Sequence, residues 1–207
     1  MEAATRVLLV RHGQTAWNVE TRIQGHLDVG LNEHGRWQAA RLAEALADEA
    51  VDAIYTSDLQ RARDTALALG RRLGLDVRDE PGLRERAFGG FEGATFQELQ
   101  ERHPEATLRW RRRDPDFEPP GGGESLEAFF ARSVAVAERL ACAHLGGSIA
   151  LFTHGGVLDC LYRAATGQPL QAPRSWVLGN ASVNRLLYGG EGFVLVGWND
   201  ARHLDQA

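Results

Sequence analysis

Two apolar runs in this chain end in the same way, and this shared ending constrains the fold more than any other feature. The stretches "RVLLVRHG" at 6–13 and "SIALFTHG" at 148–155 each close on a His-Gly pair. Continuous aliphatic runs of this length are typical of strands that are buried on both faces of a sheet. In a parallel sheet, ligand sites lie at the carboxyl ends of the strands, so both His12 and His154 would face such a site.

Helical segments with recognisable ends alternate with these strands. Asn32 is a candidate N-cap for a helix within 31–51, and the apolar positions that we expect on its buried face are Trp37, Ala40, Ala43 and Ala47. The stretch 51–74 predicts a strand, a helix start at Ser-Asp and a helix end at Gly74. Ser125 is a candidate N-cap for a third helix. This alternation predicts an α/β three-layer sandwich with a central, mostly parallel sheet.

The length of 207 residues exceeds the ~100–150 typical of one domain, but it fits one larger α/β domain over 1–207. The region at about 86–125 interrupts the strand and helix rhythm, and its second half, "RRRDPDFEPPGGGES" at 111–125, is rich in Pro, Gly and charge. Long loops of this composition in compact domains are often functional. We therefore predict a lid-like insertion with a mobile second half. The stretch 182–199 predicts a closing hairpin, and because edge hairpins can pair between subunits, we expect a monomer or a homodimer.

Charge and composition exclude several classes of function. The formal net charge is −5, which argues against nucleic-acid and membrane-surface binding, because both depend on broad positive fields. All 23 basic residues are arginines, so an anionic ligand would have to be held by a few local guanidinium groups. Cys142 and Cys160 lie in apolar helical patterns and are expected to be buried thiols of a cytoplasmic protein. No export signal and no membrane-length apolar stretch is present in the sequence.

The two strand-end histidines suit phosphoryl chemistry. A neutral imidazole can attack an electrophile, and arginine pairs with two phosphoryl oxygens at once. Arg11 precedes His12, and Arg61 follows the second strand in "SDLQRARDTA". The glycines after each histidine would let the backbone approach a ligand. The remaining histidines lack such a setting, and we expect surface or packing roles for His26, His34, His103, His144 and His203.

Some charged and aromatic residues have simpler interpretations. On charge pattern alone, Glu85 in "LRERAFGGFEG" is an ion-pair partner of Arg84 or Arg86. The run 111–113 is a solvated helix face rather than a binding patch. Trp17 and Trp37 are expected in the core.

Five motifs, in order, give this chain a family resemblance. They are "LVRHGQTAWN", "SDLQRARDTA", "LRERAFGGFEG", "PGGGESLEAF" and "FTHGG". This series resembles the histidine phosphatase superfamily, also called the phosphoglycerate mutase-like family. The resemblance implies the same sandwich fold and no metal or other cofactor. It also implies a phosphorylated nucleophile at His12, a proton donor at Glu85, and a phosphate pocket completed by His154, Arg11, Arg61, Asn18, Gln24 and Thr15.

The resemblance also implies a two-step hydrolysis of a small phosphate ester. His12 attacks phosphorus while Glu85 protonates the leaving alkoxide, and water then attacks the phosphohistidine with Glu85 as base. A phosphoglycerate mutase is the alternative, although "RAFGGFEGATFQEL" resembles the phosphatase branch more closely than the His-Tyr-Gly and Asn-Lys pattern of mutases. A catalytically silent binding protein is a third interpretation. Against it, every one of the expected central residues is present.

Overall fold

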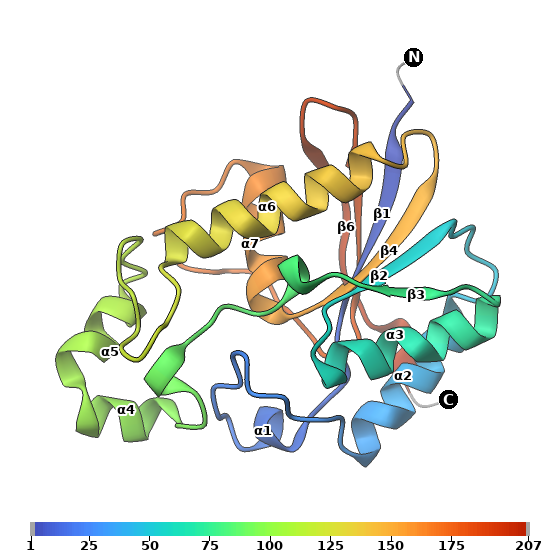
Figure 1. Ribbon diagram of the computed structural model, residues 1–207. Coiled ribbons are helices and arrows are strands. Elements are labelled where there is room, and N and C mark those ends of the chain that lie inside the picture. The colour runs from blue at the N-terminus through green and yellow to red at the C-terminus, as the bar shows by residue number, and fades with distance from the viewer. Residues whose placement is uncertain (1–2, 206–207) are drawn as a thin grey trace.

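A six-stranded sheet forms the centre of the computed structural model, which describes residues 3–205 (Figure 1). The strands are β1 (Thr5–Arg11), β2 (Ala53–Thr56), β3 (Val77–Asp79), β4 (Ser148–Thr153), β5 (Val183–Tyr188) and β6 (Phe193–Asp200). Their order across the sheet is β3-β2-β4-β1-β5-β6. The pairs among β1 to β4 are parallel, and β5 runs antiparallel to both of its neighbours. The predicted α/β class with a mostly parallel sheet is confirmed.

Helices cover both faces of this sheet. Alternate residues of β1 point to opposite sides, so Val7 and Leu9 pack in a core with α6 and α7, whereas Leu8 and Val10 pack in a second core with α2 and α3. Figure 1 shows these two helix pairs on opposite sides of the sheet. The covering helices are α2 (Glu33–Ala45), α3 (Gln60–Leu73), α6 (Leu126–Cys142) and α7 (Gly155–Thr166).

The strand register brings the two strand-end histidines together. Arg11 is the register partner of Thr153 in the β1–β4 pair, and the amide of His12 donates to the carbonyl of Thr153 at 3.0 Å. On the other side of β4, the amide of Ser57 donates to Phe152 at 2.9 Å. The carboxyl ends of β1, β4 and β2 are therefore level, and the residues that follow them share one edge of the sheet.

Most of the predicted helix ends are confirmed. The Asn32 side chain accepts the amide of Gly35 at 2.7 Å, the Ser125 side chain caps α6, and Gly74 ends α3 in the left-handed conformation. The predicted Ser-Asp start of α3 is wrong, because this helix begins at Gln60. The amide of Gln60 instead donates to the Asp28 carboxylate at 2.7 Å, a partner from a distant loop that local sequence does not reveal.

Three expectations about burial need correction. In α2, Ala40 is exposed, and the buried face runs instead through Gln38, Ala39, Leu42 and Ala43. Alanine fits either side of a helix, so an alanine pattern defines the buried face poorly. Trp17 and Trp37 are half-buried rather than core residues. Cys142, in the last turn of α6, is exposed, whereas Cys160 is buried as expected.

The stretch 86–125 has a small apolar cluster of its own. It contains α4 (Phe96–Arg102) and α5 (Pro104–Arg111), which lie beside the sheet in Figure 1 rather than on either face. Phe91, Leu99 and Phe117 are buried together there. Residues 111–125, predicted to be mobile, are anchored through the buried Phe117. The remaining short elements are α1 (Ala16–Val19) and the 3₁₀ turns Pro81–Leu83, Gly89–Phe91 and Arg202–Leu204.

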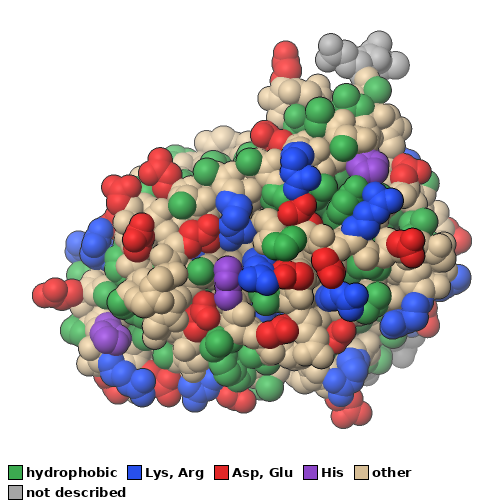
Figure 2. Space-filling model, in the orientation of Figure 1, with side chains coloured by type: hydrophobic (Ala, Val, Ile, Leu, Met, Phe, Trp, Pro, Cys, Tyr) green, Lys and Arg blue, Asp and Glu red, His purple; other side chains and the backbone are tan. Residues whose placement is uncertain are grey.

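Charged side chains of both signs are interspersed over the face in Figure 2, in keeping with the modest net charge. Arg111 and Arg112 are exposed, as expected for a solvated helix face. Arg113 is not, because it turns inward and donates to the Asp159 carboxylate at 2.8 Å and to the Leu170 carbonyl at 2.5 Å. Within residues 3–205, no helix is long and apolar enough to cross a membrane.

Candidate active site

The rings of His12 and His154 lie side by side, with their centroids 5.2 Å apart. Both are buried, at 3% and 0% exposure. The Nδ1 atom of His12 is 2.7 Å from the carbonyl oxygen of Gly13, and because a carbonyl only accepts, Nδ1 must carry the ring proton. The Nε2 atom of a neutral His12 is therefore left with a free lone pair, as a nucleophile requires.

His154 is oriented by Ser57, whose hydroxyl lies 2.8 Å from Nε2. The Ser57 oxygen also accepts the amide of Leu59 at 3.3 Å, and we assign the hydroxyl hydrogen to the bond with the ring. On this assignment Nε2 accepts and Nδ1 carries the proton of His154. That Nδ1 is buried and has no hydrogen-bond partner within the described part of the chain.

Both imidazoles are held neutral. Burial lowers the pKa of His12 well below 6.5, and the charges of Arg61 and Arg11 lower it further, against a smaller opposing effect of the Gly13 hydrogen bond. The pKa of His154 is also lowered, by burial first and then by Arg61, His12 and Arg11. A neutral His154 can act on an anionic ligand only as a hydrogen-bond donor.

Two buried arginines complete the centre. Arg61, at the start of α3, donates to the carbonyls of Leu27 at 2.9 Å and Gly25 at 2.8 Å. Arg11, at the end of β1, donates to the carbonyl of Leu178. Burial lowers the pKa of Arg61 to about 10, so the guanidinium remains charged at neutral pH. Burial also lowers the pKa of Arg11, opposed by Glu85 and assisted by Arg174.

Three buried nitrogens at this centre have no partner among the described residues. They are Nε of Arg11, Nε of Arg61 and Nδ1 of His154. Buried polar groups in proteins are nearly always hydrogen-bonded, so such a cluster calls for an explanation. Three N–H donors close to the neutral His12 are the kind of group that an oxyanion would satisfy.

Glu85 lies beside α7, and both of its carboxylate oxygens accept backbone hydrogen bonds. The donors are the amide of Gly156 at 3.0 Å and the amide of Arg86 at 2.9 Å. The predicted ion pair with Arg84 or Arg86 is wrong. The Arg84 guanidinium binds Asp58 at 2.5 and 2.7 Å, and the guanidinium of Arg86 donates to the carbonyls of Glu124 and Phe117.

The glycines after the histidines serve the packing of the chain itself. A Cβ on Gly13 would lie 2.5 Å from the Gly35 carbonyl, and one on Gly156 would lie 2.1 Å from Oε1 of Glu85. A Cβ on Gly155 would meet only Arg11, at an ordinary 3.5 Å. Close approach between parts of the chain therefore accounts for the glycines at 13 and 156, whereas no such contact accounts for Gly155.

Asn18, Gln24 and Thr15 form a connected group next to the centre. The Thr15 hydroxyl lies 3.1 Å from Oε1 of Gln24 and 3.2 Å from Oδ1 of Asn18, and it caps α1 by accepting the Asn18 amide. Thr15 is thus occupied within the chain, whereas the amide oxygens of Asn18 and Gln24 act as acceptors and leave their NH₂ groups as donors. Asn180 connects this group to the centre by donating to the carbonyl of His12 at 3.0 Å and to Asn18 at 3.2 Å.

A family model described as the histidine phosphatase superfamily (branch 1) matches residues 7–201. The chain belongs to this superfamily. A metal-independent phosphoserine phosphatase of Arabidopsis thaliana is 40% identical over 202 residues, which cover 97% of this chain and 83% of the relative. Phosphoglycerate mutase-like protein 4 of the same plant is 40% identical over 203 residues, or 97% of this chain and 87% of that protein.

Solved structures show the same relationship. This superfamily member resembles the native structure of mycobacterial glucosyl-3-phosphoglycerate phosphatase with a TM-score of 0.84 and 38% identity, over 95% of this chain and 99% of that one. The predicted family and the predicted enzyme class are confirmed. Among residues 3–205 no group of three or more His, Cys, Asp or Glu side chains is arranged to hold a metal ion.

Sequence reasoning missed several residues around the centre of this histidine phosphatase. Ser57 was considered only as a helix start, Asn180 was not considered, and His26 was expected to serve the surface or packing. The Nε2 atom of His26 lies 2.8 Å from the carbonyl of Glu85. The one available signal was the position of Ser57 directly after a buried strand, where the edge of the sheet meets the site.

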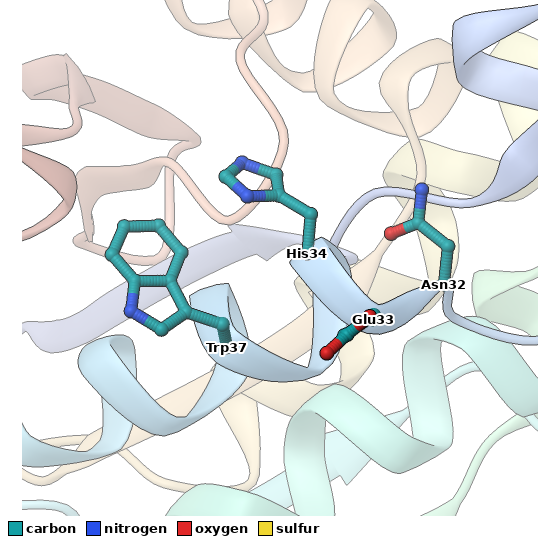
Figure 3. A pocket seen from close by; sticks show the side chains of 4 residues that line it. All are labelled: Asn32, Glu33, His34 and Trp37. Atoms are coloured by element: carbon teal, nitrogen blue, oxygen red, sulfur yellow. The ribbon is translucent and has the colours of Figure 1, made fainter.

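A separate shallow hollow of about 570 Å³ lies over the first turn of α2 in this superfamily member (Figure 3). Asn32, Glu33, His34 and Trp37 line it, and the His34 and Trp37 rings stack with centroids 5.0 Å apart. Among the described residues, no hydrogen bond or ring pair joins these four side chains to His12 or His154. The hollow is therefore treated separately from the candidate active site.

Proposed function

We propose that this protein hydrolyses a phosphate monoester of a small metabolite through a phosphohistidine at Nε2 of His12. The observation that carries the proposal is the set of unpartnered nitrogens of Arg11, Arg61 and His154 around a neutral His12. These donors match the non-bridging oxygens of a phosphoryl group, which carry its charge throughout the transfer.

In the first step, the lone pair of His12 Nε2 forms a bond to phosphorus and the bond from phosphorus to the ester oxygen breaks. Protonated Glu85 gives its proton to the departing alkoxide. In the second step, water attacks phosphorus while the Glu85 carboxylate takes a proton from it, and the N–P bond breaks to release orthophosphate. The amides of Asn18 and Gln24 donate to the phosphoryl oxygens as secondary contacts, and Thr15 holds both amides in place.

The whole chain, 1–207, would act as one histidine phosphatase domain in the cytoplasm, as a monomer or homodimer. The stretch 86–125 would act as the lid that selects the ester. It contains Arg86, which directly follows Glu85, and its own apolar cluster around Phe91 and Phe117 keeps it folded beside the site. No metal or other cofactor takes part in the proposed steps. The guanidinium groups of Arg11 and Arg61 supply the positive charge, and the neutral His154 supplies a further hydrogen-bond donor.

The substrate is proposed to bear a carboxylate in addition to the phosphoryl group. Arg174 is exposed and lies near Arg11, where it adds positive charge beside the phosphate pocket. Two of the relatives are named for the carboxylate-bearing esters phosphoserine and glucosyl-3-phosphoglycerate. A panel that pairs carboxylated with uncharged alkyl phosphates tests this, and higher kcat/KM on uncharged esters would contradict it.

Trapping of the phosphoenzyme tests the reaction itself. After a quench in alkaline detergent, wild-type enzyme should retain label from a ³²P-labelled substrate as an acid-labile, base-stable adduct, and the His12→Ala protein should retain none. Equal labelling of both proteins would contradict the assignment. Addition of 3-phosphoglycerate distinguishes a phosphatase from a mutase. If 2-phosphoglycerate forms faster than orthophosphate, the main reaction is transfer of the phosphoryl group within phosphoglycerates and not hydrolysis.

A further inference from the structure

The Arg132 side chain on α6 divides its hydrogen bonds between the segment that carries Glu85 and the Glu124 carboxylate. Its Nη1 donates to the carbonyls of Gly82 and Arg84 at 2.7 and 3.1 Å, and its Nη2 donates to the carbonyl of Glu85 at 3.3 Å. Nε and Nη2 also donate to the two carboxylate oxygens of Glu124, each at 2.9 Å. A guanidinium has five N–H donors, so none is left over.

Glu85 is thereby held from two sides. Its carbonyl oxygen lies within reach of Arg132 and of Nε2 of His26, and its carboxylate oxygens accept the amides of Arg86 and Gly156. The first pair fixes the backbone, and the second fixes the orientation of the carboxyl group. A displacement of the backbone would therefore move the carboxyl group relative to the phosphoryl position.

We propose that Arg132, clamped by Glu124, is a positioning residue for the proton donor of this enzyme. The proposal rests on the proposed function of Glu85. Because the Arg132 charge is balanced by a two-bond ion pair with Glu124, the effect on Glu85 is one of placement rather than of charge. Glu124 closes the insertion 86–125, so the same clamp joins the end of the insertion to the segment of the proton donor.

Lysine cannot replace Arg132 in this role. It offers one nitrogen with three donors in place of a planar fork with five. One ammonium cannot reach the carbonyls of residues 82, 84 and 85 and both oxygens of Glu124 together. Arg132→Lys should thus behave like a loss of function although it keeps the charge.

The leaving group reveals whether a defect acts through the proton donor. The leaving groups of alkyl esters such as O-phosphoserine and glycerol 3-phosphate are alkoxides, which leave poorly and need the proton. The p-nitrophenolate leaving group of the aryl ester departs without one. The ratio of kcat/KM on alkyl esters to kcat/KM on p-nitrophenyl phosphate is measured within one protein sample, so partial unfolding does not change it. A residue that merely stabilised the fold would leave this ratio unchanged.

The experiment compares Arg132→Gln and Arg132→Lys with Glu85→Gln and with the control Arg139→Gln. Arg139 lies on the same helix, and its side chain, which is 60% exposed, pairs with the Glu80 carboxylate at 2.5 Å. We expect Arg132→Gln to lower the alkyl-to-aryl ratio by about 10- to 100-fold, Arg132→Lys to lower it in the same direction, and Arg139→Gln to leave it unchanged. The double variant of Arg132 and Glu85 should match the ratio of Glu85→Gln alone, because a displaced donor and a missing donor cannot add.

An unchanged ratio in Arg132→Gln, with a lowered ratio in Glu85→Gln, would overturn the positioning role while leaving the proposed function intact. An unchanged ratio in Glu85→Gln would instead overturn the role of Glu85, and the role of Arg132 with it. If Arg132→Gln does not fold, Glu124→Gln takes its place. It removes the charge of the clamp and one of its two acceptor oxygens but keeps Arg132 itself, and it should lower the ratio less.

Discussion

Replacement of Gly156 by alanine should disable the proton donor without removing any functional group. The added Cβ would stand 2.1 Å from Oε1 of Glu85 and 3.0 Å from a ring carbon of Phe129. Ordinary contact begins at 3.4 Å. The Glu85 carboxyl must therefore retreat by about 1 Å, and a misplacement of that size can cost on the order of 100-fold in rate.

The preceding residue of the helix provides a matched control. Gly155 also lies in the first turn of α7, but its Cβ would meet Arg11 at an ordinary 3.5 Å. Both changes from glycine to alanine favour the helix by at most about 1 kcal/mol, so neither should lower the melting temperature for reasons of propensity. We expect Gly155→Ala to keep most of its activity.

The assay is single-turnover phosphoenzyme formation by rapid alkaline quench, on O-phosphoserine and on p-nitrophenyl phosphate. Gly156→Ala should lose about 100-fold on the alkyl ester and distinctly less on the aryl ester. Equal rates for Gly156→Ala and wild type on the alkyl ester would refute the assignment of Glu85 as proton donor. So would equal losses in the two glycine variants.

Further predictions concern pH, orientation and thiols. Because the pKa of His12 is lowered well below 6.5, the nucleophile stays neutral as pH falls through 6.5, and phosphoenzyme formation should stay level there rather than halve. The histidines of the unfolded chain bind protons as the pH is lowered from about 7.5 to 5.5, whereas the buried histidines of the folded protein do not. The free energy of unfolding measured with urea should therefore fall as the pH is lowered over this range, and a rise would contradict this. Ser57→Ala should slow both ester classes about equally and roughly fivefold, by the loss of ~1 kcal/mol of orientation at His154; a change confined to alkyl esters would argue against it. Burial raises the pKa of Cys160, so a thiol reagent should label Cys142 in the native protein and both cysteines only after denaturation.

The sequence was sufficient for the parts of the site that follow from strand geometry. Buried strands that end in histidine must present both residues at one edge of a parallel sheet, and the register of β1 against β4 does so. Asn32, Gly74 and Ser125 were found because their cap interactions are local, within a few residues of chain. The motifs added Glu85, which no periodicity would have selected.

Contacts between distant segments were beyond the sequence pattern. The neighbours of Glu85 in sequence, Arg84 and Arg86, looked like its partners, yet Arg84 binds Asp58, 26 residues away. Charge patterns identify which residues are available for pairing but not which of them meet. His26 and Arg132 both contact the backbone carbonyl of Glu85. Every residue has such a carbonyl, so the sequence cannot show which one a side chain will contact.

The way Arg61 is held has a kinetic consequence. Both terminal nitrogens of its guanidinium donate to backbone carbonyls, those of Gly25 and Leu27. The Arg61 side chain is therefore held in place before an ester binds, and the entropy of ordering it is lost during folding and not during binding. Orthophosphate presents the same oxygens as the transferred group and needs no further rearrangement to fit them. We expect orthophosphate to be a competitive inhibitor. Progress curves should slow as product accumulates, and orthophosphate added at the start should slow them in the same way. If orthophosphate does not inhibit, the pocket forms only around an ester. An enzyme with such a pocket would be inhibited by its own product, and its rate would fall as the orthophosphate concentration around it rises.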